Sequence, residues 1–492
     1  MDIESQVQGN DKTVHLTADV VVVGSGAGGG VVAAELAKAG LKVIVIEKSK
    51  HRRFEDYSNN EMDSLFNNME GNGLLQSDDA AISILAGSAF GGGTAINWAC
   101  SLRTPDKVRE EWSANTIYHT LHHKRLLTLL TLSITTKRCR KRPSMRFCNM
   151  GCPYAEKQGT HVTWLKDAAE CGTQFIQQCK VEKVTYEKGK VTGIVGTMFM
   201  SGVKLVIQAA TVVSSCGSMN SPLLLARSGL KNQHIGRNLK LHPVSFVQGY
   251  FPDRAVNPFE GGIMTSISDI VTDREGTGYG ARIEVPSMHP GVFAAIGPYR
   301  GAAAFKKMML QYKNRVSLMA LCRDYDSTAR VYQDAQGYTH IDFSLGSFDS
   351  VSLEKAIVAK MKILLAAGAT EVDAGLPGLE PLVFSEDEVS QGNTVNSAKA
   401  QQYYKRIHEI GVVGQKAKLG SAHQMGTCRM GHNPSAGVVS PHGETWEVKG
   451  LYVADASVFP TPSGVNPMVT VLAVAHSIAQ FIKSDLGVSS KL

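Results

Sequence analysis

The chain has 492 residues, of which 43% are hydrophobic and 19% charged, a composition typical of a folded globular protein and not of a disordered one. This length is enough for about three average domains, or for two large domains built from interleaved segments. The formal net charge is +7, but the stretch between Glu111 and Glu156 holds eight basic residues and no acidic one, so the rest of the chain sums to −1. A basic face spread over the protein is therefore excluded, and we expect no nucleic-acid partner.

Cysteine usage and hydropathy favour an intracellular, soluble protein. Nine cysteines, an odd number in a long chain, are typical of reduced thiols. The first twenty residues lack the basic and apolar regions of a secretory signal. The most apolar runs, "LLTLLTLSI" and "PMVTVLAVAHSIAQFI", fall short of the roughly 18 uninterrupted apolar residues that a membrane span needs.

The N-terminal stretch "ADVVVVGSGAGGGVVAAELAKAGLKVIVIEKS" predicts a dinucleotide-binding turn. An apolar strand over 19–23 leads into Gly24, Gly26 and Gly29, which form the pattern G-x-G-x-x-G, and a helix and a second strand ending at Glu47 follow. The three glycines would permit the tight turn, the approach of a pyrophosphate and close packing of helix on strand, in that order. Glu47 could accept hydrogen bonds from a ribose. A Gly-rich turn without a ligand is the alternative, and the motif alone does not choose between NAD and FAD.

Later segments add further ligand-facing features. In "LAGSAFGGGTAINWACSLRTP", Gly91, Gly92 and Thr94 mark a second close approach of the backbone to a ligand, and Asn97 offers an amide beside it. "VVSSCGSMNSPLLLARSGL" predicts a strand, a turn and a helix that starts at Ser221 and the following proline. Near the C-terminus stand "SAHQMGTCRMG" and "KGLYVADASVFPTPSGVNPMVTVLAVAHSIAQFI".

With these motifs in this order, the chain resembles the glucose-methanol-choline (GMC) family of flavoprotein oxidoreductases. "HQMGTCRMG" and "CNMGCPYAEKQGTHVTWLKDAAE" are similar to its long-chain fatty alcohol oxidase branch. The resemblance implies FAD and an α/β fold, with a Rossmann-like FAD-binding domain built from discontinuous segments and an α+β substrate domain with an antiparallel sheet. The expected segments are 18–112, 148–245 and 421–485 for the FAD-binding domain, 246–420 for the substrate domain, 113–147 for an anomalous basic segment and 486–492 for a tail.

The resemblance also assigns two catalytic residues. Oxidation of an alcohol by hydride transfer requires removal of the hydroxyl proton, and a histidine is the usual base near neutral pH. His423 in "SAHQMGTCRMG" matches the active-site base of the family, and Asn466 in "GVNPMVT" matches its second position, where it would hold the alcohol oxygen. A histidine taken at random is more often packed or exposed than catalytic, and we interpret His242 in "LKLHP" as structural.

Four more positions are expected to contact FAD by the same resemblance. Asp455 matches a position near the ribityl and phosphate groups, although it could instead simply end a strand. Pro467 and Met468 would face the isoalloxazine ring, with the N–H of Met468 stabilising charge on the reduced flavin, and Val181 is a further expected contact. No metal is expected, because Cys148 and Cys152 in "CNMGC" fit no zinc pattern and are interpreted as ordinary thiols.

Residues 115–146 do not resemble the family and lack any acidic residue. A wrongly read exon boundary is the favoured explanation, and a basic loop that touches a membrane surface, as a peripheral contact, is the alternative.

The sequence thus predicts an FAD-dependent oxidase that converts long-chain primary alcohols to aldehydes, reduces O₂ to H₂O₂ and passes a hydride to flavin N5. Alternatives are a dehydrogenase with another electron acceptor, and a catalytically impaired protein that binds flavin or a membrane. The chain ends in Ser490, Lys491 and Leu492, the tripeptide that the peroxisomal import receptor reads. A peroxide-forming enzyme fits a peroxisomal location.

Overall fold

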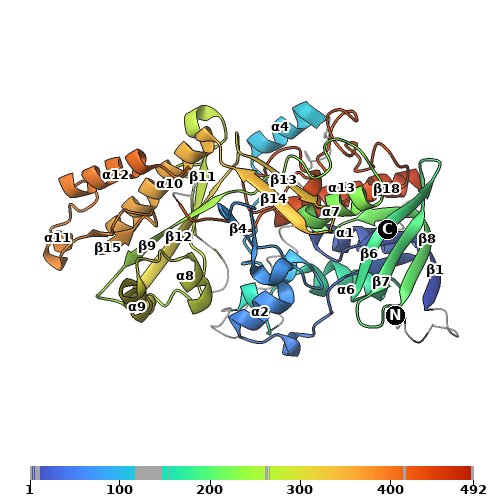
Figure 1. The fold of residues 1–492 in the computed structure, drawn as a ribbon, viewed down its shortest axis with the longest axis horizontal. Helices are drawn as coiled ribbons and strands as arrows, with labels where there is room; N and C mark the ends of the chain where they lie inside the picture. The colour runs from blue at the N-terminus through green and yellow to red at the C-terminus, as the bar shows by residue number, and fades with distance from the viewer. Residues whose placement is uncertain are drawn as a thin grey trace.

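The computed structural model describes residues 3, 5, 12–116, 147–154, 156–260, 264, 266–413 and 417–488. The chain forms two lobes, each built on a β-sheet, with helices packed around both (Figure 1). The C-terminal tripeptide and residues 117–146 of the basic stretch lie outside the described residues. Within the described ranges, no helix is long and apolar enough to cross a membrane.

The first lobe contains a sheet with the order β5-β2-β1-β8-β7-β6, and β18 pairs with the C-terminal half of β8. Five strands of this sheet run parallel: β5, β2, β1, β8 and β18. Helices cover both faces of a parallel sheet, and the strands are therefore continuous apolar runs in the sequence. Strands β6 and β7 are an antiparallel extension. The strands are β1 Thr13–Val23, β2 Val43–Ile46, β5 Gln174–Ile176, β6 Cys179–Glu187, β7 Lys190–Met198, β8 Lys204–Ser214 and β18 Leu451–Val453.

Helix α1, Ala27–Lys38, follows β1 and packs against α13, Met468–Asp485, and α6, Trp164–Glu170. Segments more than 400 residues apart in sequence therefore share one core, as the expected discontinuous domain requires. The predicted strand, glycine turn, helix and second strand at the N-terminus are confirmed.

The predicted start of the next helix is wrong. Helix α7 spans Gly217–Arg227, so it begins four residues before Ser221 and contains Pro222 in its interior. A proline at this position leaves the carbonyl of Ser218 without its helical donor. The hydroxyl of Thr427 donates to that carbonyl at 2.7 Å, and a tertiary contact thus compensates for the proline.

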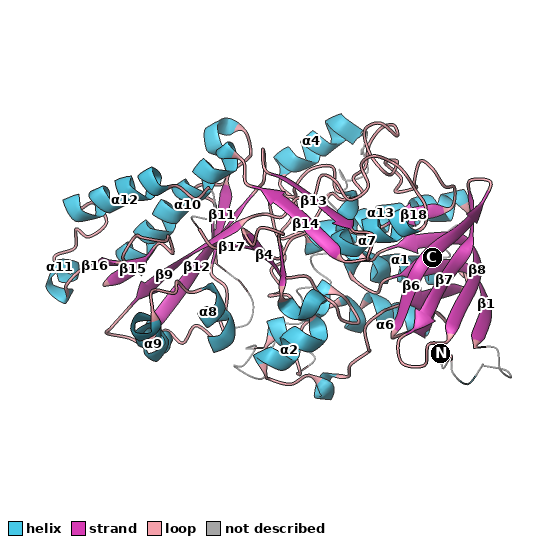
Figure 2. Cartoon of the chain, viewed as in Figure 1, coloured by secondary structure: helices cyan, strands magenta, loops and turns pink. Residues whose placement is uncertain are grey.

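The second lobe contains a largely antiparallel sheet with the order β10-β11-β12-β9-β17-β4-β3, in which β15 pairs with both β9 and β16 (Figure 2). Helices α10, Ser347–Ala366, and α12, Ala398–Ile410, lie beside one another at the far end of this lobe (Figure 2). The strands are β3 Leu75–Gln76, β4 Ile82–Ile84, β9 Val244–Tyr250, β10 Ile267–Ser268, β11 Ala281–Glu284, β12 Arg315–Cys322, β15 Glu371–Asp373, β16 Leu382–Val383 and β17 Leu419–Ser421.

The expected domain boundary at residue 112 differs from the observed pairing. Strands β3 and β4 fall in the N-terminal segment, yet they belong to the second sheet, because β4 pairs in parallel with β17. Residues 113–116 of the expected basic segment form the last turn of helix α4. The remaining elements are the hairpin β13 Thr328–Gln333 and β14 Thr339–Ser344, and helices α2 Glu61–Asn68, α3 Gly93–Ile96, α4 Asp106–Thr116, α8 Pro290–Ile296, α9 Ala302–Leu310 and α11 Glu386–Ser390.

Candidate active site

A cavity of about 500 Å³ lies at the carboxyl ends of the parallel strands of the first sheet. This is the edge at which ligands bind in open α/β sheets. Six of the predicted FAD contacts line it together: Gly24, Gly26, Glu47, Gly92, Val181 and Asp455. Gly92 comes from the second glycine-rich segment, and Gly91 lies next to it in sequence.

The room for an added Cβ atom differs among the three glycines of the turn. Gly24 and Gly29 have none, whereas Gly26 has space on its side of the turn. A Cβ atom on Gly24 would lie 2.4 Å from the carbonyl oxygen of Ser215, and one on Gly29 would lie 2.0 Å from that of Gly24. A Cβ on Gly26 would meet only the Cα of Gly92, at an ordinary 3.8 Å. The fold therefore leaves room at Gly26 that the protein itself does not use, which fits the close approach of a pyrophosphate.

Glu47 lies at the end of β2 with its carboxylate turned toward the glycine turn. Its Oε2 accepts hydrogen bonds from the backbone N–H of Ser25 at 3.0 Å and the hydroxyl of Ser25 at 2.7 Å. The Ser25 hydroxyl oxygen in turn accepts from the N–H of Gly91 at 2.9 Å. This chain joins the two glycine-rich segments on one wall of the cavity and fixes the orientation of the Glu47 carboxylate.

Asp455 is a cavity residue as well as the end of a strand. It follows β18, is 5% exposed, and accepts hydrogen bonds from the backbone N–H groups of Gly217 at 2.9 Å and Ser457 at 2.8 Å, and from the hydroxyl of Ser221 at 2.5 Å. Burial raises the pKa of its carboxyl group. Asp455 thus ties the start of α7 to the floor of the cavity.

A second cavity of about 210 Å³ adjoins the first, and Ala27, Gly87, Gly93 and Val471 line both. His423 and Asn466 lie in its wall, so the structure brings the two predicted catalytic residues together. The other predicted contacts that line this second cavity are Thr94, Asn97, Pro467 and Met468. Most of the remaining wall is apolar, with side chains that include Leu65, Met69, Ile96, Met264 and Val292.

Strand pairing explains how His423 meets His242. Gly420 of β17 pairs with Val244 of β9 in antiparallel register, so the residues after one strand face those before the other. The Nδ1 atoms of His423 and His242 are 3.2 Å apart, and the rings meet edge to face. Burial, and secondarily the charge that His242 would carry, holds the pKa of His423 well below its ordinary range. Burial also lowers the pKa of His242 to about 3, so both rings are neutral at neutral pH.

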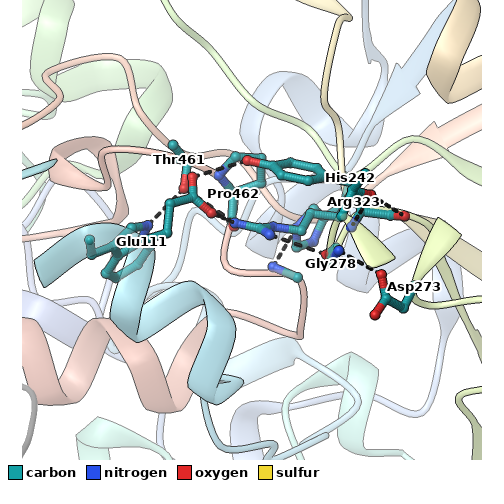
Figure 3. Close-up of polar contacts among 11 residues, drawn as sticks. Glu111, His242, Asp273, Gly278, Arg323, Thr461 and Pro462 are labelled. Atoms are coloured by element: carbon teal, nitrogen blue, oxygen red, sulfur yellow. Dashed lines mark hydrogen bonds and ion pairs between the residues drawn. The ribbon is translucent and has the colours of Figure 1, made fainter. Parts of the chain in front are cut away.

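A buried arginine, Arg323, belongs to the polar network near His242 that Figure 3 shows. Arg323 is 4% exposed, and its guanidinium donates to the carboxylate of Glu111 at 2.6 Å and to the carbonyl of Pro462 at 3.0 Å. Two residues further on, the N–H of Gly464 donates to Nε2 of His242 at 3.2 Å. Helix α4 and the loop before α13 are thereby linked to the histidine pair.

Asn466 has a partner that sequence reasoning missed. Its Nδ2 donates to Oε2 of Glu284, the last residue of β11, at 3.2 Å, which leaves the second N–H of the amide for a ligand. Glu284 is completely buried, and burial raises its pKa to about 7 against the opposing effects of Asn466 and Arg282. Among the described residues, neither Oδ1 of Asn466 nor Oε1 of Glu284 has a hydrogen-bond partner. Polar atoms buried in this way are typical of a site where water or a polar ligand supplies the missing hydrogen bonds.

Replacement of Glu284 by glutamine is expected to change how stability depends on pH. The folded protein holds the Glu284 proton up to about pH 7, whereas an unfolded carboxyl group loses it near 4.5. The contribution of Glu284 to the free energy of unfolding should therefore fall as pH rises from 4.5 to 7, by about 3 kcal/mol in total. Urea unfolding of Glu284→Gln should match the parent at pH 5 and exceed its stability by about this amount at pH 8.

The exposed Glu187 provides the matched control, since Glu187→Gln makes the same substitution on the surface, away from the cavity. A Glu284→Gln protein that gains no stability at pH 8 would show that Glu284 is already ionised in the fold.

Neither Glu284 nor the role of His242 carried a usable signal in the sequence. Glu284 is a single acidic residue at the end of a short strand, "ARIE", and nothing in that pattern distinguishes an inward carboxylate. The interpretation of His242 as structural was incomplete, because its ring contacts the predicted base. His242 also adopts a left-handed backbone conformation, with φ of +45°, which only the structure reveals.

The first sheet is doubly wound, and the cavity of about 500 Å³, called the nucleotide cavity from here on, lies at its carboxyl edge. His423 lies in the wall of the adjoining apolar cavity. This arrangement is that of a dinucleotide-dependent oxidoreductase. The sequence matches the GMC oxidoreductase family over residues 62–133, 130–244 and 327–475, and an NAD(P)-binding Rossmann-like domain over residues 22–62. The chain belongs to the GMC oxidoreductase family, as the sequence motifs predicted, and its cofactor is FAD.

Among curated proteins, the chain is 36% identical to the long-chain-alcohol oxidase FAO4A of Arabidopsis thaliana, over 95% of this chain and 69% of that protein. The solved structures that share the fold include two oxidases. Pyridoxine 4-oxidase from Mesorbium loti superposes with a TM-score of 0.66 at 16% identity, over 95% of this chain and 99% of the other. A formate oxidase of Aspergillus oryzae, studied for modification of its FAD, gives 0.64 at 13% identity, over 96% and 98%.

Proposed function

We propose that the protein oxidises long-chain primary alcohols to aldehydes and reduces O₂ to H₂O₂. The observation that carries the proposal is the apolar cavity that holds His423 and Asn466 and adjoins the nucleotide cavity. An alkyl chain would bind against the apolar wall, with its hydroxyl group at the two polar side chains. The similarity to long-chain-alcohol oxidases supports this substrate class.

His423 would accept the hydroxyl proton, because its lowered pKa keeps a neutral imidazole available. The free N–H of Asn466 would hold the alcohol oxygen, and Glu284 fixes the orientation of that amide. FAD, when bound, supplies the acceptor for the hydride of the carbinol carbon. Helix α13 begins at Met468, so the N–H groups of its first turn face this region and favour negative charge there.

An anaerobic absorption spectrum of the purified protein tests the proposal. Addition of dodecanol should bleach the flavin band, and admission of air should restore it with stoichiometric H₂O₂. A flavin that bleaches but does not reoxidise in air would assign another electron acceptor. If the flavin stays oxidised after addition of dodecanol and of its longer homologues, the proposed substrate class is refuted.

A peroxisomal location is the second part of the proposal, and it rests on the C-terminal tripeptide Ser490, Lys491 and Leu492. A fluorescent reporter that carries the last ten residues should collect in peroxisomes through the import receptor. The same reporter without the final Leu492 is the control and should stay diffuse. A diffuse signal from the complete ten-residue tail would refute this location.

The basic stretch suggests one further partner, an anionic membrane surface. Eight basic residues without an acidic one would be attracted to such lipids, and salt would screen the attraction. Salt-sensitive sedimentation with anionic vesicles, but not with neutral ones, is the expected result. Absence of binding at low salt would remove the membrane from the list of partners.

A further inference from the structure

Cys148 and Cys152 lie at the two ends of a tight turn. A short 3₁₀ helix, η5 Cys148–Met150, is followed by two residues in the left-handed region, Gly151 with φ of +110° and Cys152 with φ of +52°. The backbone thereby reverses direction, and the N–H of Cys152 donates to the carbonyl of Phe147 at 3.1 Å. Only glycine fits at position 151, because a Cβ there would lie 2.0 Å from the ring of Tyr57. The turn places the two thiols in hydrogen-bonding contact.

The surroundings of this pair favour a thiolate on Cys152. The Cys148 thiol donates a hydrogen bond to Cys152, and the backbone N–H of Lys157 donates to Sγ of Cys152 at 3.2 Å. These contacts lower the pKa of Cys152 and raise that of Cys148, so the two thiols are not equivalent. A thiolate is the reactive form of cysteine, so Cys152 is the nucleophile of the pair.

A buried cation lies beside the pair. Lys157 is 5% exposed, and its Nζ donates to the carbonyl of Cys148 at 2.5 Å and to that of Asn97 at 3.0 Å. Burial lowers its pKa to about 8, and charge on the two cysteines opposes this effect. The lysine thus connects the cysteine turn to Asn97. Asn97 lines the second, apolar cavity, which also holds His423 and Asn466 and is called the substrate cavity from here on.

The turn forms part of the wall of the substrate cavity. Asn149 and Met150, which lie between the two cysteines in sequence, line the cavity together with His423. Cys148 is 1% exposed and Cys152 is 4% exposed, so both thiols lie directly behind that wall. Such burial excludes bulky oxidants such as glutathione disulfide, so any oxidant of the pair must be small, and a peroxide is the candidate.

We propose that Cys148 and Cys152 are a peroxide-reactive dithiol that closes reversibly to a disulfide in the wall of the substrate cavity. The Cys152 thiolate attacks one oxygen of H₂O₂, an S–O bond forms, the O–O bond breaks, and the departing hydroxide takes a proton from solvent to become water. Cys148 then attacks the sulfur of the resulting sulfenic acid. An S–S bond forms, the S–O bond breaks, and the hydroxide leaves as water with the Cys148 proton. Two thiols lose two electrons, and one H₂O₂ becomes two waters.

The disulfide would change the cavity in two ways. It removes the negative charge that faces Lys157, and it ties η5 to the residue after Gly151, which shifts Asn149 and Met150. Alcohol turnover should therefore fall as the pair oxidises. That consequence rests on the proposed alcohol oxidation, and if this function holds, the enzyme's own product is the oxidant made closest to the pair. The reaction of the dithiol with added peroxide does not depend on it.

Thiol mapping of the full-length, FAD-loaded protein tests the proposal. The protein is reduced, freed of reductant and exposed to a small excess of H₂O₂, and its remaining thiols are then blocked with N-ethylmaleimide. Trypsin cleaves after Arg146 and Lys157, so one peptide carries both cysteines. This peptide should lose two hydrogens and take up no label. It should do so about tenfold faster than the exposed Cys171 is oxidised, because an ordinary thiol is mostly protonated at neutral pH.

Two variants show which sulfur reacts first. Cys148→Ser should stop at a sulfenic acid on Cys152, which dimedone traps, whereas Cys152→Ser should give no adduct on Cys148. Both are prepared with Cys139→Ser, which removes a cysteine outside the described residues. Dithiothreitol should restore the thiols and the alcohol turnover of the parent. Retention of both thiols at peroxide doses that oxidise Cys171, or trapping on Cys148 first, would overturn the proposal. An oxidised pair in a protein without alcohol turnover would refute the proposed function alone.

Discussion

Gly26→Ala is expected to yield a folded protein that purifies without its flavin. The added methyl group meets only the Cα of Gly92 at 3.8 Å, so the protein has room for it. The same methyl group would occupy the space through which the turn approaches the pyrophosphate. Overpacking of a filled site typically costs about 1–3 kcal/mol, so FAD affinity should fall about 10- to 100-fold. Flavin absorbance after gel filtration and titration of the apoprotein with FAD measure the effect.

Gly29→Ala is the contrasting variant, because its Cβ would lie 2.0 Å from the carbonyl oxygen of Gly24. This change should distort the strand–helix turn itself and reduce soluble yield and thermal stability. The pair thus separates a loss of ligand from a loss of fold. A Gly26→Ala protein with unchanged FAD affinity would show that the pyrophosphate does not approach this glycine.

His423→Ala should reduce kcat/KM for long-chain alcohols about 10²- to 10⁴-fold and leave the FAD content unchanged, since loss of a positioned general base typically has this effect. The nucleotide cavity does not include His423, which is why cofactor binding should survive. Stopped-flow measurement of anaerobic flavin reduction isolates the step. The exposed His15 offers a matched control, and His15→Ala should leave the rate unchanged.

The pH dependence of the parent provides a second test of the same assignment. A base must be unprotonated to act, and burial holds the pKa of His423 below that of an ordinary histidine. Flavin reduction should therefore stay nearly constant as pH falls from 7 to 6, where a solvent-exposed histidine base would lose most of its activity. A His423→Ala protein that still reduces flavin at the parental rate would refute the role of this residue.

Local sequence was sufficient to predict the nucleotide turn. In the stretch from β1 to Glu47, the glycine spacing, the apolar strand and the helix act over a few residues, so their conformation depends little on distant contacts. The order of motifs along the chain also allowed His423, Asn466 and the FAD contacts to be assigned by resemblance. The structure brings all of them except Gly29 and Gly91 into the linings of two adjoining cavities.

The pairing of strands that are far apart in sequence determined several contacts that could not be predicted from the sequence. The contact between His242 and His423 follows from the register of β9 and β17, which lie about 170 residues apart, and the place of β4 follows from its pairing with β17. Helix α7 begins before its proline because a hydroxyl from a distant loop satisfies the carbonyl that the proline leaves open. Such contacts depend on residues that meet only after folding.

The chemical properties of the site also fall into those that local sequence determines and those that depend on the tertiary structure. The sequence by itself determined the cofactor and the family, and it predicted His423 as the base and Asn466 as the neighbouring amide, because these depend on residue types at fixed local spacings. The tertiary structure decided the protonation of Glu284, the neutral histidine pair and the inequivalence of Cys148 and Cys152. For Glu284 and the histidine pair, protonation depends on burial and on a partner from another segment, whereas the two cysteines share one turn whose burial and hydrogen bonds exist only in the folded chain.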